Sequence, residues 1–155
     1  MRAARVANRL SPVLAGAVVL LALACGGVFV DHFNATSYQH FTDLKAFHLM
    51  FIEDFTAGQG KTWDEAAYAA RRDEGELLFR QAIEYARGRG GDTLRVHAFN
   101  ILYGRFTAHC EYLEKGAKQG EPFFSEVLAR KLVPVLTQDY DYAIRGEFAR
   151  MKDKE

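Results

Sequence analysis

The chain contains 155 residues, of which 20 are basic and 20 are acidic, so its formal net charge at pH 7 is zero. A chain without a basic surplus has no general electrostatic attraction for nucleic acid. It holds only two cysteines, which excludes a small domain stabilised by a network of disulfides.

An uncharged run of mostly apolar residues extends from Leu10 to Val30. About 20 such residues, as a helix, are enough to cross the hydrocarbon layer of a membrane. Three basic residues precede the run, Arg2, Arg5 and Arg9, and such residues remain on the cytoplasmic side. We therefore predict a cytoplasmic leader (1–9), a single transmembrane anchor (10–30) and an exported domain (31–155) on the periplasmic or extracellular side of the inner (plasma) membrane.

Two other interpretations share the export but not the anchor. The residues Ala22-Leu23-Ala24 resemble a signal-peptide cleavage site, which would remove residues 1–24. Alternatively, Cys25 is the lipidated cysteine of a bacterial lipoprotein. The apolar residues continue from Gly26 to Val30. This continuation favours the uncleaved anchor, because a cleaved chain would begin with apolar residues that nothing buries.

The exported domain has 17 basic and 20 acidic residues, a net charge near −3. This charge gives no electrostatic reason to bind nucleic acid or an anionic membrane surface. Cys25 lies in the apolar run, so Cys110 has no partner within the domain and the fold cannot depend on a disulfide. Stability must come from packing, for which the chain has 12 Phe, 7 Tyr and 1 Trp.

Glycines divide the exported domain into four segments with helical periodicity. They cluster at Gly58/Gly60, Gly88/Gly90/Gly91 and Gly116/Gly120, and glycine adopts the left-handed conformation that ends helices. The segments cover about 38–55, 62–87, 92–115 and 121–151. Because short joints make successive helices antiparallel neighbours, we predict an all-α fold in which the transmembrane or signal helix precedes an antiparallel up-down four-helix bundle.

The same periodicity predicts which side chains face the core. The first segment places one apolar stripe along Phe41, Leu44, His48, Phe51 and Phe55. The third segment has the widest apolar arc, which indicates contact with two neighbours: Leu94, Ala98, Phe99, Ile101, Leu102, Phe106 and Leu113. The buried face of the fourth is expected to comprise Phe124, Leu128, Leu132, Val135 and Leu136.

Local signals predict where the helices begin and where they are disturbed. A capping box at 62–65 begins the second helix and Asp92 caps the third. Pro122 suits the first turn of the fourth, whereas Pro134 should bend or split that helix because it has no N–H donor. Gly75 falls in the middle of the second helix, where glycine costs about 1 kcal/mol.

His48 and His109 are the candidate cofactor ligands, because each lies within an apolar stripe. Two core histidines on different helices can hold a haem iron or a metal ion. However, His48 is about ten residues into its predicted helix and His109 about seventeen into its own, an axial offset of roughly 10 Å. We therefore discount the pair as a site and expect no bound cofactor or metal.

The other polar candidates indicate structural roles. His40 and Asp43 are one turn apart, which favours a surface hydrogen bond, and His97 lies on a polar face. Cys110 flanks an apolar stripe and is expected to be a small buried side chain. Tyr140 and Tyr142 alternate with acidic residues and are either a partner-facing patch or the rim of the bundle.

Without a catalytic constellation, we expect a non-enzymatic protein. The sequence favours a membrane-anchored interaction module, an accessory subunit of an envelope complex with a protein partner. The alternatives are a domain that senses or binds a small ligand and a haem or metal carrier that uses the core histidines. The sequence leaves open whether the domain forms a homo-oligomer.

Overall fold

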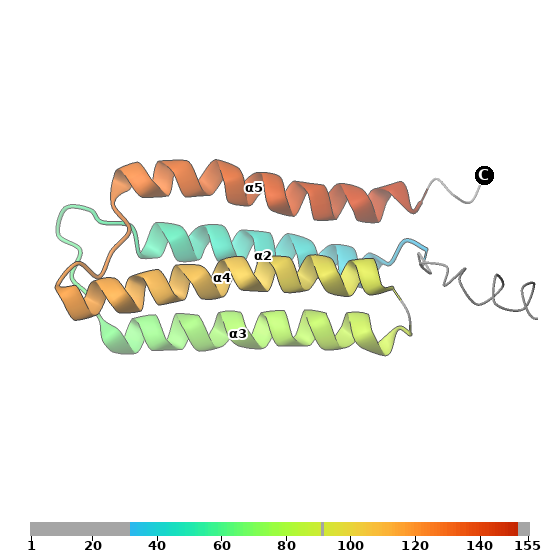
Figure 1. Ribbon diagram of the computed structural model, residues 1–155, viewed down its shortest axis with the longest axis horizontal. Helices are drawn as coiled ribbons and strands as arrows, with labels where there is room; N and C mark the ends of the chain where they lie inside the picture. Colours follow the sequence, from blue (N-terminus) through green and yellow to red (C-terminus); the bar gives the residue numbers. More distant parts are fainter. Residues whose placement is uncertain (1–31, 91, 152–155) are drawn as a thin grey trace, which may run out of the picture.

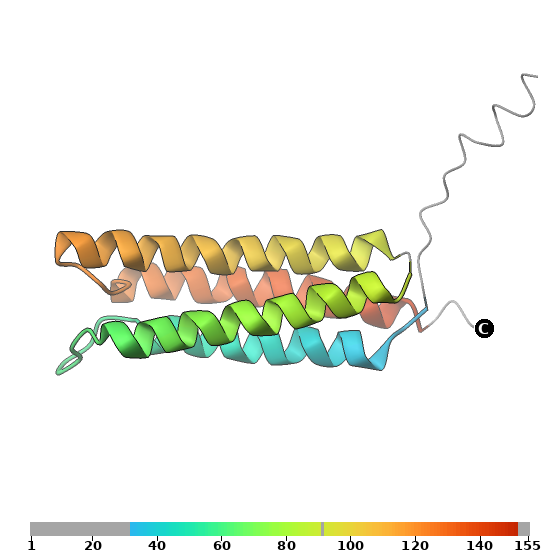
Figure 2. The ribbon, with the colours of Figure 1, turned by 90° about the horizontal axis from the view of Figure 1, so that it is seen from below.

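The computed structural model describes residues 32–90 and 92–151 as a bundle of four helices without strands. They are α2 (Ala35–Asp54), α3 (Glu65–Gly88), α4 (Thr93–Gln119) and α5 (Glu126–Ala149). Successive helices are antiparallel neighbours, and α5 closes the bundle against α2 (Figures 1 and 2). The predicted all-α class and four-helix bundle are therefore confirmed.

The beginning of α2 and the end of α5 lie together at one end of the bundle (Figure 1). We call this the near end, and the opposite one the far end. The connection between α3 and α4 is also at the near end, whereas the other two connections are at the far end. The predicted anchor at 10–30, with its cleavage and lipidation alternatives, lies outside the described residues. Among the described helices, none is both long and apolar enough to cross a membrane.

A side-chain cap begins each helix. Asn34, Asp64, Asp92 and Ser125 each accept a hydrogen bond from a backbone N–H of the first turn. The cap at Asp92 was predicted. The cap of α3 is Asp64 rather than Thr62, and α5 begins at Glu126 rather than near Pro122, because Ser125 provides the cap.

The glycine clusters are confirmed as joints. Among the described residues, each cluster contains a glycine with a positive φ, namely Gly60, Gly90 or Gly120. At the far end the two connections are also tied together. Ala57 N donates to the Phe124 carbonyl over 2.8 Å, and Phe124 N donates to the Phe55 carbonyl over 2.9 Å. Phe124 is thereby buried before α5 begins.

The predicted stripe of α2 is buried along its whole length, from Phe41 to Phe55. The apolar arc of α4 is buried only in part, because Leu94 and Ile101 remain about half exposed. In α5 the prediction for Val135 is wrong: this side chain is exposed, whereas Leu136 and Tyr140 are buried.

Pro134 does not split α5, which is continuous from Glu126 to Ala149. The residue is on the exposed side of the helix. The carbonyl of Arg130, which has lost its donor at Pro134, can therefore be satisfied by water.

Candidate functional site

A hydrogen-bonded chain of three side chains crosses the core and joins three helices. The Tyr140 hydroxyl of α5 lies 3.1 Å from Nδ1 of His48 on α2. The other ring nitrogen of His48, Nε2, lies 2.9 Å from Nδ1 of His109 on α4. Tyr140 and His48 are fully buried and His109 is half-buried, so the chain runs from the interior toward the surface.

The structure brings His48 and His109 together, so the axial offset expected from the sequence is wrong. The helix of His48 begins at Ala35, three residues earlier than predicted. His48 is therefore 13 residues beyond the start of α2 and His109 is 16 beyond the start of α4. The remaining difference is about 4.5 Å at 1.5 Å per residue, which two long side chains and the stagger of the helices accommodate.

The hydrogen-bond partners determine where the protons lie. A tyrosine hydroxyl has one proton to donate, and within the described residues His48 is its only partner. Tyr140 therefore donates to His48 Nδ1, and His48 Nε2–H donates to His109 Nδ1. The proton of His109 is then on Nε2, directed away from His48. If the hydrogen bonds ran in the reverse direction, His48 Nδ1–H would donate to the Tyr140 oxygen. The Tyr140 hydroxyl proton would then have no acceptor among the described residues.

Burial keeps both histidines neutral. It lowers the pKa of His48 to about 3, and the neighbouring His109 lowers it further in the same direction. Burial also lowers the pKa of His109, with a smaller contribution from the positive charge of Arg105. Burial raises the pKa of Tyr140. At pH 7 these three hydrogen-bonded side chains are therefore uncharged, and they are suited to hold three helices in register.

The surroundings of the histidine pair support this structural role. The rings of Phe79 and Phe106 lie at 6.3 and 5.3 Å from the His48 ring, centroid to centroid, in edge-to-face geometry. In the part of the chain that the structure describes, no three His, Cys, Asp or Glu side chains form a group that could hold a metal ion. The direct hydrogen bond between the rings also leaves no gap between them for a haem macrocycle.

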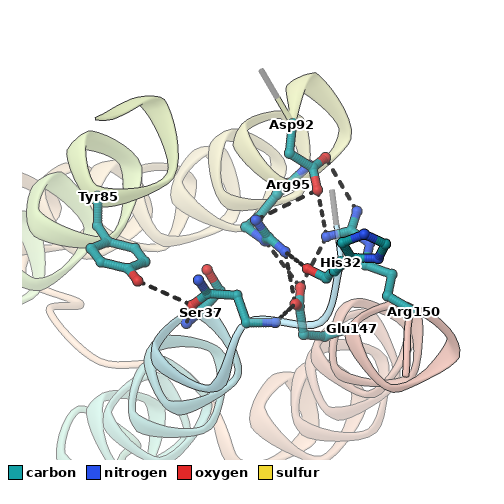
Figure 3. Close-up of polar contacts among 8 residues, drawn as sticks. His32, Ser37, Tyr85, Asp92, Arg95, Glu147 and Arg150 are labelled. Atoms are coloured by element: carbon teal, nitrogen blue, oxygen red, sulfur yellow. Dashed lines mark hydrogen bonds and ion pairs between the residues drawn. The ribbon is translucent and has the colours of Figure 1, made fainter. Parts of the chain in front are cut away.

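An ionic cluster of four side chains closes the near end of the bundle (Figure 3). Arg95 of α4 binds Glu147 of α5 through two contacts, of 2.8 Å from Nη2 and 3.1 Å from Nε. Arg150 Nη1 lies 2.6 Å from Oδ2 of Asp92 and 3.0 Å from Oε2 of Glu147. All of them are buried except Arg150, which is largely so. Asp92 is at the start of α4 and Arg150 at the end of α5, so each side chain also complements the helix dipole.

The ionic cluster also holds the segment that leads into α2. Arg95 Nη2 donates to the His32 carbonyl over 3.1 Å, and the backbone N–H of Asn34 donates to Glu147 Oε1 over 2.7 Å. Tyr85 of α3 donates to the Asn34 side chain over 3.2 Å. Residues 32–34 are thus attached to α3, α4 and α5.

Sequence reasoning missed the ionic cluster, although a signal was present. Arg95 precedes Phe99 and Leu102 at spacings of four and seven, so it falls on the buried stripe of α4. Glu147 follows Tyr140 by seven residues and falls on the buried stripe of α5. A charged residue in register with an apolar stripe is the pattern that indicates a buried ion pair.

The remaining candidates have structural positions. Cys110 is buried as predicted, and burial raises the pKa of its thiol to about 12, so it is not a nucleophile at neutral pH. His97 is exposed, in line with its predicted polar face. Asp43 accepts a hydrogen bond from Gln39 over 2.7 Å rather than from His40.

The two tyrosines of α5 separate into different environments. Tyr140 belongs to the core and not to a partner-facing patch, whereas Tyr142 is 60% exposed. Tyr142 lies in a groove of about 550 Å³ between α4 and α5, toward the near end. Apolar side chains line much of this α4–α5 groove: Phe41, Leu94, Ala98, Ile101, Leu102, Tyr142 and Ala143.

A second groove, of about 720 Å³, lies between α2 and α5 toward the far end. Pro134 and Val133 of α5 line it together with Leu49 and Ile52 of α2. Charged side chains also line this groove, among them Glu53, Lys61 and Arg130. Both grooves flank α5, one on its α4 side and the other on its α2 side.

No protein family, curated protein or solved structure matches this chain. Its function therefore has to be argued from its own residues.

Proposed function

We propose that the chain is a membrane-anchored accessory protein whose exported bundle binds a helix of a partner membrane protein in the α4–α5 groove. The observation that supports this most is the exposed part of the apolar arc of α4. Leu94 and Ile101 are 48% and 49% exposed, and Tyr142 faces the same groove. Nothing within the bundle accounts for the exposure of these apolar side chains. Exposed apolar side chains that gather in one groove are typical of a binding surface.

The shape of the groove favours a helix as its occupant. It lies between two long antiparallel helices, and an amphipathic helix fits such a groove with its apolar side chains spaced at three and four residues. The buried Phe41 and Leu102 line the groove at depth, where they can contact such a helix. Because the groove extends toward the near end, a partner in the same membrane can reach it.

Matched substitutions test the groove. Ile101→Arg places a charge in the groove, whereas Leu77→Arg places one on the exposed surface of α3 outside either groove, at a similar exposure of 54%. We expect the partner that co-purifies with the unchanged chain from detergent extracts to be retained by Leu77→Arg and lost by Ile101→Arg. Melting curves of both variants check that the bundle remains folded. Retention by both variants would exclude the groove as the binding site.

The orientation has its own test. Gln59 is exposed in the connection at the far end, and Asn8 precedes the apolar run. In spheroplasts we expect a membrane-impermeant maleimide to label Gln59→Cys at once, and to label Asn8→Cys only after lysis. The two native thiols add little background, because Cys110 is buried and Cys25 lies within the proposed anchor. The intact mass of the purified protein distinguishes an uncleaved anchor from removal of 1–24 and from lipidation at Cys25. Labelling of Asn8→Cys before lysis would contradict the proposed topology.

A further inference from the structure

Three aromatic side chains form a cluster on the near end of the bundle: Phe33, Tyr38 and Phe148. The Phe33 and Phe148 rings are stacked at 6.3 Å, and the Tyr38 ring meets Phe148 edge-to-face at 5.0 Å, centroid to centroid. Burial of the cluster is incomplete, because Phe148 is 45% exposed and the next apolar residue, Met151, is 48% exposed. An aromatic cluster at the end of a bundle, rather than in its core, requires an explanation.

The position of Phe33 is fixed by its neighbours in the chain. The backbone on either side, at His32 and Asn34, is hydrogen-bonded to Arg95 and Glu147 of the ionic cluster. This segment is therefore part of the bundle and not a free linker. The direction in which the chain approaches α2 is set by the ionic cluster.

The sequence limits how far this end can be from the apolar run. Phe33 is three residues after Val30, and three residues extend over about 10 Å at most. The polar headgroup region on each side of a membrane is about 5–8 Å thick. If the run spans the membrane, Phe33 and the rings stacked on it are held at or next to the headgroup layer.

Basic side chains stand at the same end. Arg87 and Arg89 are exposed at the end of α3, where the chain turns toward α4. Arg87 forms an exposed pair with Glu84 over 2.6 Å, one turn earlier on the same helix, and such an exposed pair exchanges partners at little cost. The domain as a whole is slightly acidic, but charges act on a membrane surface within about a Debye length, so the local sign decides. Aromatic and basic side chains together are the usual composition of the membrane–water interface.

We propose that the near end of the bundle docks on the lipid headgroup layer, with Phe33, Tyr38 and Phe148 contacting lipid and Arg87 and Arg89 facing the phosphates. This inference depends on the proposed anchor at 10–30. Docking at the near end directs the long axis of the bundle outward from the membrane, with the far end distant from the bilayer. The α4–α5 groove is then presented just above the membrane surface, where a partner helix leaves the bilayer.

Tryptophan fluorescence tests the docking, because the chain provides its own distant control. Trp63 is the sole tryptophan and precedes α3 at the far end, about 35 Å from the near end along 24 residues of helix. The full chain is reconstituted in vesicles of phosphatidylethanolamine and phosphatidylglycerol with brominated acyl chains. Phe148→Trp in a Trp63→Phe background puts the only tryptophan in the cluster. Met50→Trp in the same background is a matched control with 51% exposure, on α2 away from the near end.

We expect brominated lipid to quench the emission of the Phe148→Trp variant, while the Met50→Trp variant and the unchanged chain keep theirs. Flotation of each protein with the vesicles after alkaline extraction shows separately whether the anchor is embedded. If the Phe148→Trp variant floats but is not quenched, the docking is overturned and the anchor remains. Blue-shifted but unquenched emission from this variant would likewise overturn the docking, because protein, such as a second copy, then covers the cluster. A chain that does not float would overturn the anchor and the docking together.

Discussion

Gly75 explains how two of the largest core side chains fit in the middle of the bundle. A Cβ atom at this position would collide with the ring of Phe106 and lie 2.7 Å from Cε1 of Phe47. The glycine therefore lets α3 approach α2 and α4 closely. Its cost in helix propensity, about 1 kcal/mol, is offset by the packing of these rings.

This close approach predicts opposite effects for two glycine substitutions. Gly75→Ala gains helix propensity but overpacks the core, so we expect the free energy of unfolding to fall by about 1–2 kcal/mol. Gly104→Ala adds a Cβ on the exposed side of α4, where no atom lies within 4 Å, and should raise it by about 1 kcal/mol. Urea unfolding of the full chain in mild detergent, followed by Trp63 fluorescence, measures both. An increase in stability for Gly75→Ala would contradict the packing.

At the scale of the helices, the hydrogen-bonded chain of Tyr140, His48 and His109 joins α5, α2 and α4. Ridges of apolar side chains permit several registers, whereas three polar groups that satisfy one another permit one. The arrangement is sensitive to acid. Protonation of His48 would place a charge in the core and remove the lone pair that accepts from Tyr140.

The lowered pKa of His48 predicts that the bundle loses stability in mild acid. The unfolded chain binds a proton near pH 6.5 and the folded chain only near pH 3. Between these values the unfolded state holds more protons, so stability falls as the pH falls, by up to about 1.4 kcal/mol per pH unit. We expect His48→Gln to reduce this slope between pH 6.5 and 5, where few carboxylates titrate. His97→Gln, at an exposed histidine outside the core, is the matched control variant. An unaltered slope in His48→Gln would assign the acid sensitivity to another group.

At the scale of the whole molecule, the ionic cluster connects the end of the bundle to the chain that leads into it. The cluster is buried, so its charges are not screened by solvent as surface pairs are. Removing one partner leaves the others uncompensated in the interior. The cluster thereby stabilises the near end and determines the orientation of the bundle relative to the segment 32–34 that leads into it.

Substitution of Arg95 tests the contribution of the cluster. Arg95→Met keeps most of the side-chain volume but leaves Glu147 with one guanidinium fewer, and we expect a loss of about 3–5 kcal/mol in unfolding free energy. Arg130→Met removes an exposed pair with Glu126 on α5 and should cost less than about 1 kcal/mol. The same urea titration compares the two variants. Equal effects would show that the buried cluster contributes no more than a surface pair.

Regular features of the helices were predictable because they depend on residues close in the chain. The stripe from Phe41 to Phe55, the cap at Asp92 and the glycine joints follow from periodicity and backbone conformation. The beginning of α5 was less predictable, since Pro122 and Ser125 are both good signals for a helix start. The environment of Val135 was wrongly predicted because α5 has apolar residues on more than one side. The sequence of such a helix does not indicate which side packs against the neighbouring helices.

The candidate sites depended on relations that no single segment contains. An all-helical class and four amphipathic segments follow from the order of apolar and polar residues alone. The contact between His48 and His109 depends on the relative stagger of two helices, and a three-residue change in one helix start alters that distance by about 4.5 Å. The pairing of Arg95 with Glu147, 52 residues away, likewise arises only when α4 and α5 pack side by side. Local steric preferences act within a turn or two of helix, whereas buried polar groups select their partners by proximity in the folded molecule.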